Sequence, residues 1–162
     1  MSRPQYERTF TPPTPESRAV IEKWIRMLRS NRNTQTRGHL RDTEGFCCLG
    51  VACKAAGRRF DKSSGNYRCD GHEYDLPLKV REALGLTDDN HSDHAASPGV
   101  RVGPGLGGMV ALSTLNDQQR LTFHQIAYLI EQDWLKGTPV RDSVEEFRNK
   151  WDQGKYKKKL PK

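Results

Sequence analysis

One stretch of the chain, residues 45–57, limits what the rest can fold into. It reads Gly-Phe-Cys-Cys-Leu-Gly-Val-Ala-Cys-Lys-Ala-Ala-Gly and is the densest run of small and apolar residues in the sequence. Only 34% of the residues are hydrophobic and 29% are charged, so few other segments can be fully buried. Small side chains let neighbouring elements approach closely. We therefore expect a buried helix over about residues 47–56, ended by Gly57, on which the other helices pack.

Three further helices are predicted because apolar residues recur at helical spacing. The first runs from Thr14, a typical N-cap, to about Arg29. The second begins at Thr122, where Gln125 completes a capping box. The third is expected to open at Thr138-Pro139, because proline is common at the first position of a helix. Their apolar faces are Val20, Ile21, Trp24, Ile25 and Leu28; Phe123, Ile126, Ala127, Ile130 and Trp134; and Val140, Val144, Phe147 and Trp151.

The segments between these helices are rich in turn residues. Asp70-Gly71 is a strong signal for a two-residue hairpin turn, so we predict a small β-hairpin from strands 66–69 and 72–74. A short helix is expected over residues 78–84. Residues 87–108 have the composition of a long surface loop, and a short helix or turn is expected to follow it. The fold class predicted is a helix-rich α+β domain with four to five helices and one small β-hairpin.

The two ends of the chain differ in composition from the middle. Residues 1–13 contain three prolines and scattered charge, and we expect a flexible arm. Residues 152–162 form a lysine-rich basic tail, and residues 14–151 are predicted to form a single globular domain. No apolar run reaches the roughly 18–20 residues that cross a bilayer, and the first residues lack the apolar centre of a secretion signal. A cytoplasmic protein that makes no contact with a membrane is therefore expected.

Positive charge is the clearest functional feature. The net charge is +7 and the isoelectric point is about 9.4, which favours acidic partners such as nucleic acid. Arginine suits bidentate contact with phosphate, and lysine suits non-specific contact with a nucleic-acid backbone. A tyrosine among the tail lysines, Tyr156, could stack on a base. The predicted nucleic-acid-binding residues are Arg26, Arg29, Arg32, Arg37, Arg41, Lys155, Lys157, Lys158 and Lys159.

The cysteines define an alternative site. Cys48 and Cys53, together with Cys69 and His72, offer four ligands of the types that bind zinc. Two ligands five residues apart on a helix point about 140° apart, however, and a free cysteine often serves as a small core residue. We therefore predict no metal and no other cofactor, and keep these four residues as the zinc candidate. A buried thiol is also a poor nucleophile, so no enzymatic activity is predicted.

Six motifs follow one another through the middle of the chain. They are Trp24-Ile-x-x-Leu-Arg-Ser30, Gln35-Thr-Arg-Gly-x-Leu-Arg41, Gly45-Phe-Cys-Cys-Leu-Gly-Val-x-Cys53, Leu76-Pro-x-x-Val-x-x-x-Leu-Gly-Leu86, Leu115-Asn-Asp117 and Thr122-Phe-x-x-Ile-Ala-x-x-Ile-Glu131. Together they resemble a family of short, mostly uncharacterised proteins from bacteriophages and prophages. The resemblance covers roughly residues 20–135 and leaves out the proline-rich arm and the lysine tail. It implies a viral origin and no particular chemistry.

The function predicted is that of a phage-encoded, non-enzymatic accessory protein in the host cytoplasm. It would bind nucleic acid or a nucleoprotein assembly, mainly through phosphate contacts. Two alternatives stay open. One is a module that inhibits or redirects a host protein, because Trp24, Trp134 and Trp151 are of a residue type common at binding hot spots. The other is a binder of a small anionic nucleotide, which would use the arginines and the glycine-rich segment 102–108.

Overall fold

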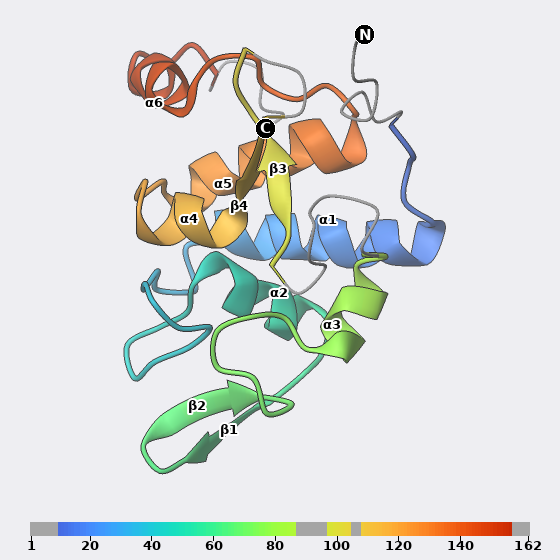
Figure 1. The fold of residues 1–162 in the computed structure, drawn as a ribbon, viewed down its shortest axis with the longest axis vertical. Coiled ribbons are helices and arrows are strands. Elements are labelled where there is room, and N and C mark those ends of the chain that lie inside the picture. Colours follow the sequence, from blue (N-terminus) through green and yellow to red (C-terminus); the bar gives the residue numbers. More distant parts are fainter. Residues whose placement is uncertain (1–9, 87–96, 105–107, 157–162) are drawn as a thin grey trace, which may run out of the picture.

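The computed structural model describes residues 10–86, 97–104 and 108–156. Within these residues the fold is α+β and rich in helix, as the sequence predicts (Figure 1). Two separate two-stranded antiparallel sheets accompany the helices. No described helix is both long and apolar enough to cross a membrane. In chain order the elements are α1 (Pro15–Arg29), α2 (Cys48–Ala55), β1 (Phe60–Ser63), β2 (Asn66–Cys69), α3 (Leu78–Ala83), β3 (Gly99–Arg101), β4 (Met109–Ala111), α4 (Leu112–Asp117), α5 (Phe123–Ile130), the π-helix η2 (Glu131–Leu135) and α6 (Val144–Asp152).

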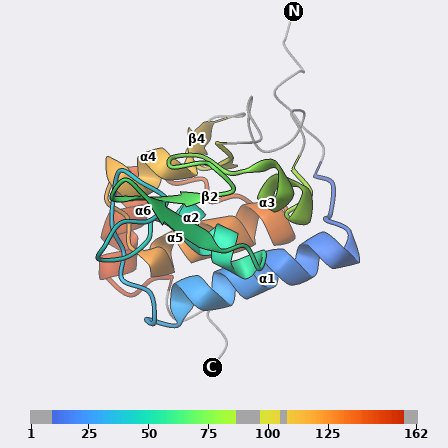
Figure 2. The same cartoon turned by 90° about the horizontal axis from the view of Figure 1, so that it is seen from below.

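The first helix, α1, lies between α2 and α5 in Figure 1 and packs on both, and Figure 2 shows it along one edge of the domain, so the centre of the core lies where its inner face meets these helices. Two fully buried tryptophans mark this centre: the rings of Trp24 and Trp134 meet edge to face, with centroids 5.6 Å apart. The indole N–H of Trp24 donates to the backbone oxygen of Cys48 (2.9 Å), and that of Trp134 donates to the backbone oxygen of Gly99 (3.0 Å). Because both polar groups are bonded, the two rings are buried without an unsatisfied donor.

The predicted helix starts of α1 and α5 are confirmed. The side chain of Thr14 accepts a hydrogen bond from the backbone N–H of Ser17 (3.2 Å) at the start of α1. At the start of α5, Thr122 and Gln125 form the capping box in both directions. These contacts satisfy donors that a helix would otherwise leave without partners. Helical structure continues beyond α5 as η2, which ends shortly before Gly137.

The second helix, α2, is the buried helix predicted from the central stretch. Every residue of α2 except Lys54 is buried. Gly50 faces the backbone of Leu40 so closely that a Cβ atom there would lie 1.9 Å from the Leu40 carbonyl oxygen. Only glycine allows this approach. The small residues of the central stretch therefore bring residues 38–42 against α2.

The predicted hairpin is wrong in its second strand. The strands that pair are β1 and β2, in a register that places Phe60 opposite Cys69 and Ser63 opposite Asn66. Their turn is Ser64-Gly65, with φ of 53° and 83°. The predicted turn, Asp70-Gly71, has the same kind of backbone (φ 49° and 86°), but only one residue pair, Cys69 and His72, bridges after it. Ser64-Gly65 and Asp70-Gly71 are consecutive turns with the same backbone conformation. Only the second has the strong Asp-Gly sequence signal, so the sequence indicated the wrong turn for the hairpin.

Two further predictions are corrected toward the C-terminus. The short strands β3 and β4 pair in register Gly99 to Ala111, in a segment predicted as loop followed by helix or turn. The last helix begins after Ser143, not at Thr138-Pro139, and Ser143 forms a capping box with Glu146. The signal at Thr138-Pro139 fails because residues 138–142 form no helix, and Val140 instead bridges Val102 beside β3. The segments 87–96 and 105–107 of the predicted loop lie outside the described residues.

An aromatic cluster holds α6 on α5. Tyr128 of α5 packs against Phe147 and Trp151 of α6, and Tyr156 completes the group with ring centroids 5.1 Å from Tyr128 and 5.0 Å from Phe147. The Tyr156 hydroxyl also donates to the carboxylate of Asp142. Tyr156 therefore packs on the domain through its ring, although the sequence indicated a base-stacking role. The predicted arm also includes a packed residue, because the ring of Phe10 covers Gly137.

Candidate nucleic-acid interface

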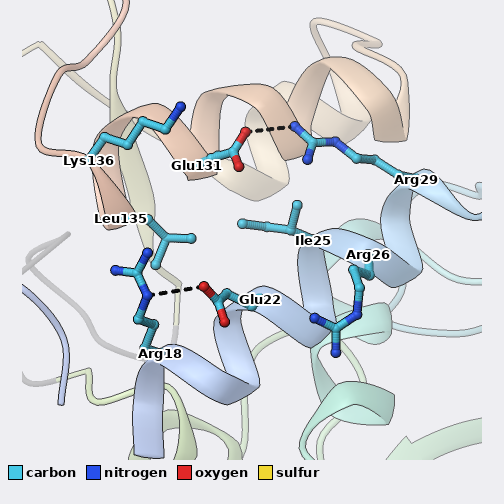
Figure 3. A pocket seen from close by; sticks show the side chains of 8 residues that line it. All are labelled: Arg18, Glu22, Ile25, Arg26, Arg29, Glu131, Leu135 and Lys136. Atoms are coloured by element: carbon cyan, nitrogen blue, oxygen red, sulfur yellow. Dashed lines mark hydrogen bonds and ion pairs between the residues drawn. The ribbon is translucent and has the colours of Figure 1, made fainter. Parts of the chain in front are cut away.

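A cleft of about 310 Å³ lies between α1 and η2. We call it the α1–η2 cleft. In Figure 3 two apolar side chains, Ile25 and Leu135, occupy its middle, and charged side chains surround them. The charged residues are Arg18, Glu22, Arg26, Arg29, Glu131 and Lys136. Four cations against two carboxylates give the cleft a net positive charge.

Helical spacing explains how α1 supplies most of this lining. Arg18, Glu22, Arg26 and Arg29 follow one another at intervals of three or four residues, so their side chains form one row along the helix. The apolar residues of α1 project toward the core on the neighbouring side of the helix. The opposite wall comes from η2 and the residue after it, where Glu131 and Leu135 are four residues apart. The packing of α1 against α5 and its continuation η2 therefore creates the cleft.

Two ion pairs lie at the rim of the cleft, one within α1 and one between α1 and η2 (Figure 3). Arg18 bonds Glu22 at 3.0 Å, with both side chains more than 40% exposed. Arg29 bonds Glu131 at 2.9 Å, and these side chains are only 26% and 22% exposed. An exposed pair of the first kind contributes little to stability, about 0–1 kcal/mol. An incoming anion can therefore compete for Arg18 more easily than for Arg29, which joins α1 to η2.

The five predicted arginines do not form one equivalent surface. Arg26 and Arg32 are exposed, and within the described part of the chain their side chains form no ion pair. Arg29 pairs with Glu131, as described above. The side chain of Arg37 donates to the backbone oxygen of Asn116 (3.2 Å). Arg41 is half-buried beneath the hairpin. Arg26, Arg32 and Arg37 are thus exposed, but Arg37 is held by a hydrogen bond within the domain, as Arg29 is by an ion pair and Arg41 by aromatic rings.

The contacts of Arg41 form a cluster that the sequence prediction missed. Its guanidinium carbon lies 4.2 Å from the ring centroid of Tyr67, 5.1 Å from that of Phe46 and 5.7 Å from that of Phe60. Lys54 also lies over Phe46, at 4.7 Å. Cations stacked on aromatic rings are attracted to the negative faces of those rings. The sequence signal that could have indicated this cluster is the presence of aromatic and basic residues on both β1 and β2. Once the two strands pair, Phe60 and Tyr67 lie on the same face of the hairpin.

The structure places only part of the predicted lysine tail. Lys155 is exposed and immediately precedes the packed Tyr156. Lys157, Lys158 and Lys159 lie outside the described residues. The three tryptophans considered for a protein-binding surface are buried, since 8% or less of each is exposed. They contribute to the core and do not form an exposed binding patch.

The four zinc candidates are not gathered at one point. The thiol of Cys48 donates to a backbone oxygen of α4 (3.6 Å), and Nδ1 of His72 lies 2.9 Å from a carboxylate oxygen of Asp75. Cys53 and Cys69 contact each other through their side chains, whereas Cys69 and His72 are joined through their backbones. Among the described residues no group of three or more His, Cys, Asp or Glu side chains is arranged to hold a metal ion. The spacing of Cys48 and Cys53 on α2 separates these two side chains.

All four cysteines are buried free thiols. Burial raises the pKa of Cys47 to about 11 and that of Cys48 well above its ordinary value. The hydrogen bond between Cys53 and Cys69 raises the pKa of Cys53 and lowers that of Cys69. Because the thiolate is the reactive form and none of these residues is exposed, the cysteines offer no accessible nucleophile.

A buried asparagine, Asn116, positions the segment that carries the arginines. Its side-chain oxygen accepts from the amide of Gln35 (2.8 Å) and from the backbone N–H of Cys48 (3.2 Å), which is the first residue of α2. Its side-chain nitrogen donates to the backbone oxygen of Thr36 (2.9 Å) and to Asp117 (2.7 Å). Asn116 thus caps α2 and fixes residues 35–37 on α4. In the sequence it was visible only as part of the Leu-Asn-Asp motif.

Comparison with known proteins gives one match. The model of a family described as "Domain of unknown function (DUF8296)" matches residues 17–134. This segment includes α1 except its first two residues, α2, both sheets and the whole α1–η2 cleft except Leu135 and Lys136. No curated protein matches the chain, and no solved structure does.

Proposed function

The chain belongs to the family of the domain of unknown function DUF8296, and we propose that it is a phage-encoded, non-enzymatic accessory protein that binds nucleic acid. It binds free nucleic acid or a nucleoprotein assembly, in the host cytoplasm, through contacts with phosphate. The viral origin is supported by the sequence motifs of residues 24–131. The binding mode is supported by the distribution of charge on the structure.

One observation carries the proposal: of two exposed arginines that form no ion pair among the described residues, one lines a cleft with a cationic rim (Figure 3) and the other lies close to it in the sequence. Arg26 lines the α1–η2 cleft, and Arg32 follows shortly after α1. Arginine presents a planar fork of donors that fits two phosphate oxygens. The exposed pair of Arg18 with Glu22 can open at small cost and add a third guanidinium.

The test is fluorescence anisotropy of a labelled duplex and of its separate strands, with the full-length protein at salt concentrations between about 50 and 200 mM. We expect binding that weakens as salt rises. The double substitution Arg26→Gln/Arg32→Gln should lower affinity for every nucleic acid. It should also reduce the slope of log K against log salt by about 0.7–0.9 for each phosphate that the variant no longer binds.

The matched control is Arg120→Gln/Arg141→Gln. Arg120 and Arg141 are exposed and outside the cleft, and their removal lowers the net charge by the same amount. Equal weakening by both double variants would show that net charge alone drives binding and would refute the assigned surface. Absence of binding to duplex and single strands at low salt would refute the function itself.

A binder of a small anionic nucleotide is the second candidate, because of the size of the α1–η2 cleft. Its volume of about 310 Å³ is at the lower end of the range for small-molecule sites, about 300–1,000 Å³. A ligand that binds only the folded state raises the unfolding temperature. A rise with mononucleotides or cyclic nucleotides and none with polymers would favour this candidate over nucleic-acid binding.

A further inference from the structure

We propose that a second cleft, between residues 39–43 and the tip of the β1–β2 hairpin, binds one unstacked base of a single-stranded nucleic acid. We call it the hairpin cleft. It has a volume of about 230 Å³ and is lined by residues 39, 41–43 and 65–67. The inference rests on the proposed function and deepens it, because it names single strands as the preferred form. It also assigns a preference for bases with an exocyclic amino group.

The wall of the hairpin cleft offers stacking surfaces. The guanidinium of Arg41 lies 4.2 Å from the ring centroid of Tyr67, and both residues line the cleft. Phe46 and Phe60 support Arg41 from below, at 5.1 and 5.7 Å. Aromatic rings and arginine planes are the two surfaces on which proteins stack unpaired bases. Tyr67 and Arg41 are both half-buried, so they are held in place and still reach solvent.

A preoriented carboxylate faces the same cleft. The backbone N–H of Asp42 donates to the oxygen of Gly45 (2.9 Å), and its carboxylate oxygen Oδ1 accepts from the N–H groups of Glu44 (2.8 Å) and Gly45 (3.0 Å). These bonds fix the side chain. Within the described residues, Oδ2 accepts no hydrogen bond, so it is available to a ligand.

The carboxylate determines which bases fit. Cytosine, adenine and guanine carry an amino group that can donate to Asp42, as cytosine N4 does to acidic residues in known recognition. Thymine and uracil lack an amino group, and their ring donor, N3–H, lies between two carbonyl oxygens that a carboxylate repels. Asn66 and Thr43, also in the lining, add groups that both donate and accept.

Two neighbouring residues extend the site. His39 lines the cleft and packs against Tyr74, with the ring planes tilted by 34° and the centroids 5.0 Å apart, and Tyr74 is 60% exposed. This pair provides a second surface for an adjacent base. Lys62, opposite Tyr67 in the strand register, holds its ammonium 5.4 Å from the Tyr67 ring. Its charge suits the phosphate beside the stacked base.

The test compares labelled oligo-dC, oligo-dT and a duplex in anisotropy titrations with the full chain. We expect oligo-dC to bind about tenfold more tightly than oligo-dT. Tyr67→Leu should weaken binding of single strands about tenfold and leave the duplex unchanged, whereas Tyr67→Phe, which keeps the ring, should bind as the wild type. Thermal unfolding of each variant confirms that it is folded.

The role of Asp42 has its own control. Asp42→Asn should bring the oligo-dC to oligo-dT ratio close to one. Asp61→Asn removes the same charge from the exposed face of the hairpin, away from the cleft, and should leave the ratio unchanged. Backbone amide shifts in NMR spectra should change at residues 39–43 and 65–67 on addition of oligo-dC.

The outcomes separate this inference from the proposed function. In one outcome, all nucleic acids bind and Arg26→Gln/Arg32→Gln lowers their affinity, but Tyr67→Leu has no effect and oligo-dC and oligo-dT bind equally. This outcome refutes the base site and leaves the phosphate-binding surface in place. If free cytidine monophosphate binds as tightly as oligo-dC, the cleft is a nucleotide site and the single-strand inference is overturned. If no nucleic acid binds, both proposals fail.

Discussion

Replacing Gly50 with alanine should destabilise the protein, although alanine is the better helix former. In a helix interior alanine is favoured over glycine by about 0.5–1 kcal/mol, and Gly50 is the third residue of the eight in α2. Here a methyl group would lie 1.9 Å from the carbonyl oxygen of Leu40, where ordinary contact starts at 3.4 Å. The two backbones must therefore separate by roughly 1.5 Å, the difference between these distances.

Leu40 cannot move by this amount without cost. Its oxygen accepts from the N–H of Cys47 (3.1 Å), its N–H donates to Glu73 (2.8 Å), and its side chain is fully buried. Each weakened hydrogen bond contributes about 0.5–1.5 kcal/mol, and overpacking costs about 1–3 kcal/mol. Against the gain in helix propensity, we expect a net decrease of about 2–4 kcal/mol in the free energy of unfolding.

Urea unfolding followed by tryptophan fluorescence measures this change, since Trp24 and Trp134 are both buried. The control is the difference between Lys54→Ala and Lys54→Gly, at a half-buried position of the same helix. There alanine should be the more stable by about 0.5–1 kcal/mol. A Gly50→Ala protein as stable as the wild type, or more stable, would refute the close approach of Leu40 to α2.

Three other expectations concern buried polar groups. Asn116→Ala leaves several buried hydrogen-bonding groups without partners, so it should lower the free energy of unfolding, measured by urea unfolding, by about 3–5 kcal/mol. A decrease below about 1 kcal/mol would contradict the role of Asn116 as the cap of α2. Asp133 is 1% exposed and bonds Arg101 at 2.7 Å, so Asp133→Asn should cost about 2–4 kcal/mol, and Asp133→Leu/Arg101→Met should recover most of it. Burial raises the pKa of Cys47 from 9.0 to about 11, so the thiol loses its proton at lower pH in the unfolded chain than in the folded one. The stability that this group contributes is therefore complete below pH 9 and falls between pH 9 and about 11. The slope is about 1.4 kcal/mol per pH unit, and Cys47→Ala should flatten the profile of stability against pH by that amount.

Structural features that depend only on residues close together in the sequence, such as helix starts and apolar helix faces, could be predicted from the sequence. Thr14 and Thr122 cap helices through contacts three residues away, and the apolar faces of α1 and α5 follow from spacing alone. The start of α6 shows the limit of such signals. Thr138-Pro139 and Ser143 are both good helix starts, and the choice between them depends on the bridge from Val140 to Val102, nearly forty residues before it in the chain.

The candidate site was predictable only as a set of charges. Arg26 and Arg29 resemble each other in sequence, yet one is exposed and the other is bonded to Glu131, a residue 102 positions away. The hairpin cleft is still less visible, because it joins residues 39–43 to residues 65–67 through the stacking of Arg41 on Tyr67. Contacts between distant segments decide which cations remain available for a ligand, and spacing along the chain does not reveal those contacts.

The bonds of Asn116 also determine when the first half of the chain can fold. Its partners Gln35 and Cys48 precede it by 81 and 68 residues, so both contacts close long loops. Closing loops of this length is slow compared with forming a helix. During synthesis, α2 therefore has no cap until α4 has emerged from the ribosome. The segment before β3 should behave as an incomplete folding unit, and the domain should fold in one cooperative step after most of it has been made.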